Sequence, residues 1–396
     1  MAYNFFYYAP TEVIFGKDTI GQVGDLVKKY GGTKVLFIYG SERIRTNGLL
    51  DQIEASMKKA DIPYWLLGGV VPNPHIEKAR EGMEIAKREG IDFFIGIGGG
   101  SAIDTAKAIA YGMTDPDRDV WELYDERVKR IPSGCYPVAA ILTIAAAGSE
   151  TSNSSVLTNA ATGEKRSYNS ELARPKFAIM DPTFTMTLPD WQTESGCADM
   201  MMHTMERYFV QGDTMELTDT MAEALLRTVI KYAKVLHKDP QNYEARAEVM
   251  WAGSLAHNGL TGCGIKSGDF ACHAIEHELG GMFDVTHGAG LAAIWGTWAR
   301  YVYKDCLPRF VRYAIEVMQV TPGETDEETA LKGIEAMEDF YREIGMPTCI
   351  RDLGIDPTDE QCREMARSAM SASGGSRGAA KVLHEEDVYN ILTAAR

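Results

Sequence analysis

Residues Phe93–Lys107 read FFIGIGGGSAIDTAK, and this stretch decides the fold. Its first part, Phe93–Ile97, is a continuous apolar run, as expected of a parallel strand that is buried on both faces. Its last part begins the helical pattern Ser101–Tyr111, for which Ser101 is a good N-cap and Asp104 completes a capping box. A buried strand that passes through a glycine turn into a helix predicts one unit of an α/β fold.

The turn itself, Gly98, Gly99, Gly100 and Ser101, is a candidate phosphate site. Glycines let a phosphate approach the backbone, and the free N–H groups and dipole of the helix N-terminus attract negative charge. The turn is not the G-x-G-x-x-G fingerprint, because counting from Gly96 puts Ser101 at the last glycine position, and no Walker Gly-Lys-Ser/Thr follows. The alternative interpretation is a plain strand-to-helix turn.

The same alternation of short strands and helices extends to both sides of this turn. The predicted strands are Lys34–Tyr39, Tyr64–Leu67, Phe93–Ile97 and Val138–Leu142, and the predicted helices between them are Asn47–Lys59, Ile76–Arg88 and Ser101–Tyr111. This order predicts a parallel sheet with helices on both faces.

After Pro189 the strand-like runs largely stop and helical periodicity takes over. The predicted helices are Cys197–Val210, Leu217–Val235, Tyr243–Asn258, Ala271–Glu278, Gly290–Tyr301, Leu307–Val317, Asp326–Ile344 and Asp359–Ser371. We therefore expect two domains, an α/β domain over 1–188 and an all-helical domain over 189–396.

Composition excludes several classes of function. The 396 residues include 40 Lys+Arg and 56 Asp+Glu, a net charge of −16 that disfavours nucleic acid and anionic membranes as partners. Seven cysteines without a Cys-x-x-Cys pair indicate a thiol-reducing cytoplasm. We expect no signal peptide in Met1–Phe15, and the longest apolar stretch, Tyr136–Ala147, is too short to span a bilayer.

A set of Asp and His residues in the helical half points to a metal. Asp199 and His203 lie four residues apart in one predicted helix, His273 and His277 lie four apart in another, and His287 follows. Residues four apart lie on one helix face, and a carboxylate with three or four imidazoles suits Zn²⁺ or Fe²⁺. A single Asp-x-x-x-His pair is often only a structural hydrogen bond, but five such residues between 199 and 287 favour a metal site.

Two other interpretations of these histidines remain open. His273-Ala-Ile-Glu276-His277 matches the H-x-x-E-H pattern of inverted zinc peptidases, in which Glu276 is the general base. That interpretation leaves the glycine turn and Asp199 without a role. A metal that only joins two helices, without turnover, is the other alternative.

A series of short segments, taken together and in order, resembles one known family. The segments are PTEVIFGK at Pro10–Lys17, Pro72-Asn73-Pro74, GGGSAIDTAK at Gly98–Lys107, TIAAAGSE at Thr143–Glu150, Thr162–Lys165, DPTFTMTLP at Asp181–Pro189, the Asp199/His203 helix and the His273, His277, His287 run. Over essentially its whole length the chain resembles the iron-dependent (group III) alcohol dehydrogenases, in particular their NADPH-dependent butanol dehydrogenase and aldehyde reductase branch.

The resemblance implies a Rossmann-like N-terminal domain, a helical C-terminal domain and a homodimer. It implies hydride transfer between a nicotinamide and a primary alcohol or aldehyde, such as butanol or butanal, with one Fe²⁺ or Zn²⁺. The implied metal ligands are Asp199, His203, His273 and His287, and His277 lies beside the substrate as a catalytic proton relay. The implied cofactor-binding residues are Gly40, Ser41, Gly98, Gly99, Gly100, Ser101, Asp104, Thr143, Ser149 and Lys165.

A polyol (glycerol-type) dehydrogenase or a dehydroquinate synthase of the same superfamily is the related alternative. Such an enzyme needs polar or basic residues around the substrate. Met200–Met202, Trp295 and Trp298 favour an apolar substrate instead.

The segment after the first predicted strand, Gly40-Ser41-Glu42-Arg43, bears on the choice of cofactor. NAD-preferring relatives tend to carry at the position of Gly40 an Asp that holds the ribose 2′-OH and repels a 2′-phosphate. The absence of that Asp, with Ser41, Arg43 and Arg45 nearby, predicts NADP(H) over NAD(H). Glu42 is the one carboxylate that opposes this preference.

Overall fold

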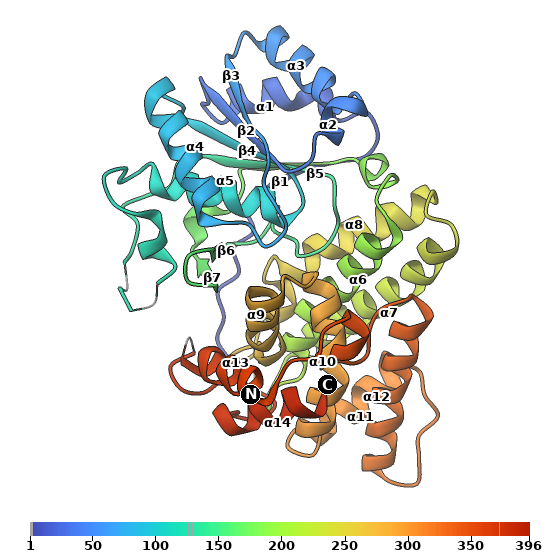
Figure 1. The fold of residues 1–396 in the computed structure, drawn as a ribbon. Helices are drawn as coiled ribbons and strands as arrows, with labels where there is room; N and C mark the ends of the chain where they lie inside the picture. The colour runs from blue at the N-terminus through green and yellow to red at the C-terminus, as the bar shows by residue number, and fades with distance from the viewer. Residues whose placement is uncertain (1–2, 126, 129, 372) are drawn as a thin grey trace. The chain divides into compact units, whose positions relative to one another are not determined.

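The computed structural model describes residues 3–125, 127–128, 130–371 and 373–396 (Figure 1). The chain divides into two compact units. The first unit covers residues 8–187. The second covers residues 188–396 and also includes the described residues before Tyr8. The N–H of Tyr3, for example, donates to the Gly264 carbonyl at 3.1 Å. Met1 and Ala2, which belong to the predicted first domain, lie outside the described residues.

The first unit is built on a six-stranded sheet with the order β1-β8-β5-β4-β2-β3, and every neighbouring pair is parallel. The strands are β1 (Glu12–Phe15), β2 (Val35–Tyr39), β3 (Tyr64–Leu67), β4 (Phe93–Gly98), β5 (Val138–Leu142) and β8 (Phe177–Met180). The predicted parallel sheet is confirmed. Strands β1 and β8 were not predicted.

Helices cover both faces of this sheet (Figure 1). They are α1 (Val23–Lys29), α2 (Arg43–Thr46), α3 (Leu49–Ala60), α4 (Ile76–Glu89) and α5 (Gly100–Gly112). Alternate residues of β2 point to opposite faces. Val35 and Phe37 pack in the cluster that contains α1 and α3. Leu36 and Ile38 pack in the cluster that contains α4 and α5.

A small antiparallel hairpin follows β5, with β6 at Ser154–Asn159 and β7 at Glu164–Asn169. Sequence patterns did not predict it, because β7 (EKRSYN) is mostly polar. The remaining short elements are 3₁₀ helices: η1 (Ile20–Gln22), η2 (Val120–Leu123), η3 (Glu171–Ala173), η4 (Pro182–Thr185), η5 (Leu260–Gly262) and η6 (Ile350–Leu353).

The strand order creates a topological switch point between β2 and β4. From β2 the chain moves to β3 on one side of the sheet and then to β4 on the other side. The segment that begins at Gly40 follows the carboxyl end of β2, and the glycine turn follows that of β4. Ligands of open α/β sheets bind at such a point, so the two predicted cofactor segments lie where the fold favours a dinucleotide.

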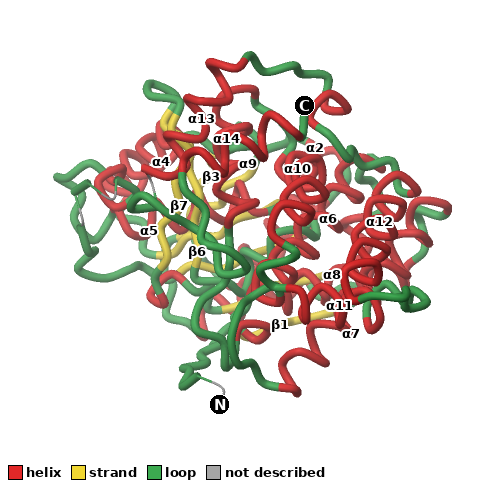
Figure 2. Tube along the Cα trace, turned by 90° about the horizontal axis from the view of Figure 1, so that it is seen from below, coloured by secondary structure: helices red, strands yellow, loops and turns green. Residues whose placement is uncertain are grey.

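The second unit is helical, as predicted, and Figure 2 shows its helices in red. They are α6 (Asp190–Tyr208), α7 (Glu216–Lys238), α8 (Tyr243–His257), α9 (Ala271–Phe283), α10 (His287–Val302), α11 (Leu307–Glu316), α12 (Asp326–Glu343), α13 (Asp359–Ser371) and α14 (Glu385–Ala394). The start of α6 was predicted too late because its first turns bury the polar residues Thr193, Glu194 and Ser195, which hide the apolar period. Helix α14 was not predicted. None of the described helices is long and apolar enough to cross a membrane.

Candidate active site

The turn between β4 and α5 presents backbone that an anion can reach. Gly98 has φ +151°, which L side chains rarely adopt, so glycine is required there. Helix α5 begins at Gly100 with Gly99 as its N-cap, and no side chain of the described residues caps it. The predicted capping box of Ser101 and Asp104 is therefore wrong. The N–H groups of the first helical turn have no acceptor within the helix, and this favours a phosphate.

The carboxylate of Asp104 is engaged inside the protein instead. Its Oδ1 accepts a hydrogen bond from the Ser149 hydroxyl at 2.5 Å, and its Oδ2 accepts one from the Val156 N–H at 2.9 Å. Asp104 and Ser149, both predicted to bind the cofactor, are buried and contact each other. The two side chains thus link α5 to the segment that contains Ser149.

Thr143 and Lys165 lie on different segments. Thr143 follows β5, the neighbour of β4, and its N–H donates to the Gly98 carbonyl at 2.9 Å. Lys165 is buried on β7, opposite Thr158 of β6. The structure brings Thr143 directly to the glycine turn and places Lys165 on the adjoining hairpin.

Packing explains why residue 40 is a glycine. A Cβ atom at Gly40 would lie 2.6 Å from the Val70 carbonyl oxygen, so any side chain would force the backbone apart. The absence of Asp at this position therefore carries no information about the cofactor. Next to it, the Ser41 hydroxyl accepts a hydrogen bond from the Arg43 N–H at 3.2 Å, and both residues are exposed.

Glu42 and Arg45 form an exposed ion pair, in which the Glu42 carboxylate keeps its negative charge. The Arg45 Nε lies 2.7 Å from a Glu42 carboxylate oxygen, and a second Arg45 nitrogen donates to the Tyr39 hydroxyl at 3.0 Å. Arg45 is thus already engaged by two partners. Of the basic residues at this segment, Arg43 is the better candidate to meet a 2′-phosphate.

Three helices of the second unit carry the predicted metal-site residues. Asp199 and His203 lie one turn apart on α6, His273 and His277 lie one turn apart on α9, and His287 is the first residue of α10. The predicted ligands on α6 and α9 are buried, and the imidazoles of His277 and His287 are partly exposed.

Gly288 explains how α10 reaches α6. A Cβ atom at Gly288 would lie 1.9 Å from the Ser195 carbonyl oxygen, so only glycine allows this approach of the two backbones. Because His287 immediately precedes Gly288, this close approach brings its imidazole to α6.

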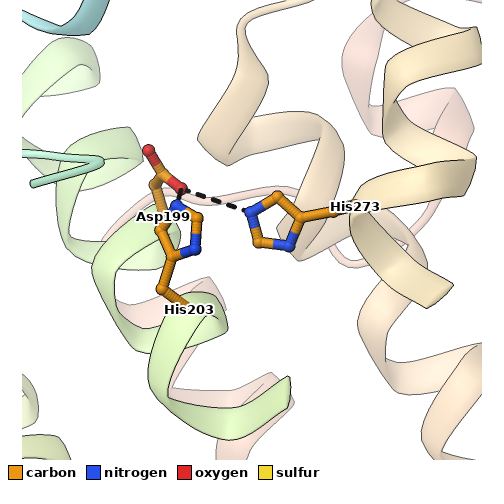
Figure 3. Close-up of side chains that lie close together, drawn as sticks. All are labelled: Asp199, His203 and His273. Carbon is orange, nitrogen blue, oxygen red and sulfur yellow. Dashed lines mark ion pairs between the residues drawn. The ribbon is translucent and has the colours of Figure 1, made fainter. Parts of the chain in front are cut away.

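Nitrogen atoms of three histidines converge on one carboxylate oxygen. Asp199 Oδ1 lies 3.3 Å from His203 Nε2, 3.8 Å from His273 Nε2 and 3.7 Å from His287 Nε2. Four ligands about 2.1 Å from a tetrahedral cation are roughly 3.4 Å apart, so these separations fit one divalent ion. Figure 3 shows Asp199 and His203 on one helix facing His273 on another.

Buried polar atoms of the cluster support the same fit. Asp199 Oδ1 and His273 Nε2 are inaccessible to solvent and have no hydrogen-bond partner among the described residues. Burying a polar atom without a partner is unfavourable by about 1–3 kcal/mol. A cation between these two atoms satisfies both, and carboxylate with imidazole is a donor set that iron and zinc accept.

Two buried glutamates orient the histidines. Nδ1 of His273 contacts a carboxylate oxygen of Glu206, and Nδ1 of His287 contacts one of Glu276. A carboxylate on Nδ1 fixes the ring so that Nε2 faces the metal. Sequence reasoning missed Glu206 as a partner, although it lies three residues after His203 and therefore on the same helix face. Glu276 was considered only as a peptidase base.

The electrostatics of the cluster differ between His203 and His273. Burial holds the pKa of His203 well below its ordinary value, and the neighbouring His257 and His273 lower it further, so His203 is a neutral imidazole as a metal ligand must be. Burial also acts to lower the pKa of His273, but the Glu206 and Asp199 carboxylates outweigh it and raise that pKa to about 9. The site thus stabilises positive charge next to His273.

Two further histidines border the cluster. The ring of His257, at the end of α8, lies 3.8 Å from the ring of His203 between centroids, tilted by 33°. The ring of His277 lies 5.9 Å from that of His287. His257 was not predicted as a site residue, and no spacing on α6 or α9 could have identified it because it comes from another helix.

The peptidase interpretation does not fit this geometry. It requires His273 and His277 on one ion with Glu276 as the base, but the two rings are 6.4 Å apart. The described residues group His273 with Asp199 and His203, and His277 with Glu276 and His287. Glu276 is fully buried and contacts His287.

A glycine turn at the switch point of a parallel sheet, together with three histidines and one carboxylate that can hold a metal, is the arrangement expected of a metal-dependent dehydrogenase. Comparison with known families gives the same class. A profile described as iron-containing alcohol dehydrogenase matches residues 10–182, and one described as the C-terminal part of the Fe-containing alcohol dehydrogenase family matches residues 193–396. The chain belongs to the iron-containing alcohol dehydrogenase family, and the resemblance found in its sequence is confirmed.

Similar proteins cover the whole chain. It is 40% identical to NADH-dependent butanol dehydrogenase A of Clostridium acetobutylicum over 98% of both chains. It is 32% identical to an NADPH-dependent aldehyde reductase of Escherichia coli over 89% of this chain and 90% of the other. The crystal structure of NADH-dependent butanol dehydrogenase A from Thermotoga maritima superposes with a TM-score of 0.94 at 38% identity, over 99% of this chain and 98% of that one. The protein is a metal-dependent alcohol dehydrogenase or aldehyde reductase.

Proposed function

We propose that the protein interconverts a short primary alcohol and its aldehyde, such as butanol and butanal, with a nicotinamide dinucleotide. The observation that carries the proposal is the convergence of three histidine Nε2 atoms on Asp199 Oδ1, at 3.3–3.8 Å. The names of the relatives support butanal as the substrate. The apolar residues singled out in the sequence do not, because Met200–Met202, Trp295 and Trp298 are fully buried in the protein core.

Each residue has a defined task in this proposal. Asp199, His203, His273 and His287 hold one divalent cation, Fe²⁺ or Zn²⁺. Such a cation, when bound, polarises the carbonyl oxygen of an aldehyde, while the nicotinamide supplies the hydride. His277 gives a proton from its imidazole to the alcohol oxygen during reduction and takes it back during oxidation. The glycine turn and Ser101 bind the pyrophosphate through backbone N–H groups.

For the cofactor, we propose that NADP(H) is accepted alongside NAD(H) and that Glu42 sets the preference. Exposed Ser41 and Arg43 can bind a 2′-phosphate, which supports NADPH. The exposed Glu42 carboxylate opposes it, and the relatives that are about 40% identical are named as NADH-dependent. One charge–charge interaction of this kind is sufficient to reverse a preference.

Glu42→Gln tests this cofactor proposal. We expect the ratio of kcat/KM for NADPH to that for NADH to rise about tenfold, because a repulsion worth about 1.4 kcal/mol is removed. Glu54→Gln on α3, also in the first unit, is the control and should leave the ratio unchanged. An unchanged ratio in Glu42→Gln would show that another residue sets the preference.

The proposed reaction is tested by NADH and NADPH oxidation with butanal, followed by absorbance, beside glycerol and other polyols in the reverse direction. Butanal reduction supports the proposal. Turnover of polyols alone would show that the substrates are polyols and not short primary alcohols. Bound metal and dinucleotide without any turnover would favour a structural metal.

We also propose a cytoplasmic homodimer. All seven cysteines, each among the described residues, are without disulfides, which supports a reducing compartment. The dimer rests on the family resemblance alone, and sedimentation of the purified protein tests it.

A further inference from the structure

A fully buried lysine of α5 has no place in the mechanism above. Lys107 is 0% exposed. Its ammonium group donates to the Ser154 carbonyl at 2.7 Å, to the Ser149 carbonyl at 2.8 Å and to the Ser152 carbonyl at 3.1 Å. The Ser149 hydroxyl accepts a further hydrogen bond from it at 2.9 Å. Because a buried charge is unfavourable unless it is hydrogen-bonded, this set of acceptors is what makes Lys107 tolerable there.

All of these acceptors belong to one segment, residues 143–154, which comprises the β5–β6 connection and Ser154, the first residue of β6. Before Ser154 the segment has no strand, so no strand ladder fixes the path of residues 143–153. Instead, the buried ammonium group of Lys107 donates hydrogen bonds to three carbonyl groups of this segment and so holds them close together. Arg174 adds a second support by donating to the Thr151 carbonyl at 2.7 Å.

Asp104, one helical turn before Lys107, fastens the same connection. Its carboxylate accepts from the Ser149 hydroxyl and from the Val156 N–H, and its carbonyl accepts from the Ser155 hydroxyl at 3.0 Å. Ser149 therefore receives a hydrogen bond from Lys107 and gives one to Asp104. The two charges of α5 are linked through this hydroxyl, which lowers the penalty of burying both.

The connection also touches the glycine turn. Its first residue, Thr143, donates to the Gly98 carbonyl at 2.9 Å. A Cβ atom at Gly99 would lie 3.1 Å from the Ile144 Cβ, so this part of the connection packs directly on the turn. The shape of the connection therefore decides what a dinucleotide on the turn would meet.

We infer that Lys107 is a positioning residue of the dinucleotide site: its ammonium group fixes the 143–154 connection against α5 before the cofactor binds. This inference rests on the proposed function, because it assumes a dinucleotide on the glycine turn. Fixing the connection in advance removes an ordering penalty from binding, and this improves cofactor affinity without any direct contact.

The test compares Lys107→Met, which keeps most of the length of the side chain but removes its donors, with Lys58→Met on the exposed face of α3. The dissociation constant of NADH is measured by titration of the metal-loaded protein, with melting followed by circular dichroism. We expect Lys107→Met to weaken NADH at least about tenfold, with a raised KM for the cofactor, an unchanged KM for butanal and unchanged metal content. Lys58→Met should bind as the wild type does.

An equal dissociation constant in Lys107→Met and the wild type overturns the inference. If the wild type itself binds neither NADH nor NADPH, the proposed function fails instead, and the two failures are thus distinguishable. Should Lys107→Met not fold, hydrogen exchange of the wild type decides. The amides of residues 143–154 are expected to be protected without cofactor, and fast exchange there that slows only on adding NADH would contradict the inference.

Discussion

The two candidate sites differ in how the chain builds them. The glycine turn is contiguous, residues 98–101, and its geometry follows from one strand and one helix. The metal site is assembled from α6, α9 and α10, whose ligands span positions 199 to 287. In a contiguous site the local sequence determines the backbone geometry. A dispersed site depends instead on close helix packing, such as that of Gly288 on Ser195. We therefore expect mutations to separate the two sites cleanly.

The largest separation is expected from Asp199→Ala. It removes the oxygen atom on which the three histidines converge, so metal content should fall to background and the rate of NADH oxidation by about 1,000-fold or more. NADH binding should remain near that of the wild type. The control is Asp190→Ala at the exposed start of α6. Wild-type activity in a metal-free Asp199→Ala protein would contradict the role of Asp199 as a ligand of a catalytic metal.

A smaller effect on the same site is expected from Glu206→Gln. The amide no longer holds the His273 ring as a carboxylate does, and the affinity for Zn²⁺ should fall about 10–100-fold. Competition with a metal-sensitive dye measures it, beside Glu244→Gln, an exposed residue of α8. Equal affinities would mean that Glu206 only satisfies backbone groups at the start of α9.

The dinucleotide site is probed by Gly98→Ala. A side chain at φ +151° strains the turn by about 1–3 kcal/mol, so we expect NADH to bind about tenfold more weakly while the metal content stays the same. Gly21→Ala is the matched control, since a Cβ atom there meets no described atom within 4 Å and φ is not positive. Loss of metal in Gly98→Ala would contradict the independence of the two sites.

The smallest effect is a pH dependence that comes from Lys107. Burial lowers its pKa from 10.5 to about 8, although Asp104 and Glu150 oppose the shift, and Arg174 acts with burial. Between pH 8 and 10.5 the unfolded chain therefore binds more protons than the native protein, so this group makes the free energy of unfolding rise with pH. The rise is at most about 1.4 kcal/mol per pH unit. The free energy of unfolding in urea is measured at pH 7.5 and 9.5 for the wild type and Lys107→Met. The increase with pH should be larger in the wild type, and an equal increase in both proteins would contradict the prediction.

How much the sequence predicts also differs between the two sites. Strands β3 and β5 were predicted with their observed ends, because each is a continuous apolar run; β5 is buried throughout, and β3 is a half-buried strand at the edge of the sheet. At the glycine turn, however, Asp104 was assigned to a capping box, whereas Ser149 and Val156 use its carboxylate. Those partners lie more than 40 residues away, and no local rule can find them.

In the metal site, the sequence identified the central residues but not the residues around them. The residue types and their i,i+4 spacing identified a set of five candidates, and the ligands among them were chosen by the family resemblance. The structure brings three of the set, Asp199, His203 and His273, together. The orienting carboxylate of Glu206 and the neighbouring, tilted ring of His257 were not found, because acidic and histidine residues on helices are common and only packing shows which of them touch a ligand.

The most direct test of the account is one experiment on metal-stripped protein. NADH binding and NADH oxidation with butanal are measured on the same sample, before and after Fe²⁺ or Zn²⁺ is added. The account predicts that the stripped protein binds NADH with wild-type affinity, oxidises none of it, and recovers turnover with the metal. Butanal reduction by the stripped protein at the rate of the metal-loaded enzyme would contradict the assignment of Asp199, His203, His273 and His287 as the catalytic metal site.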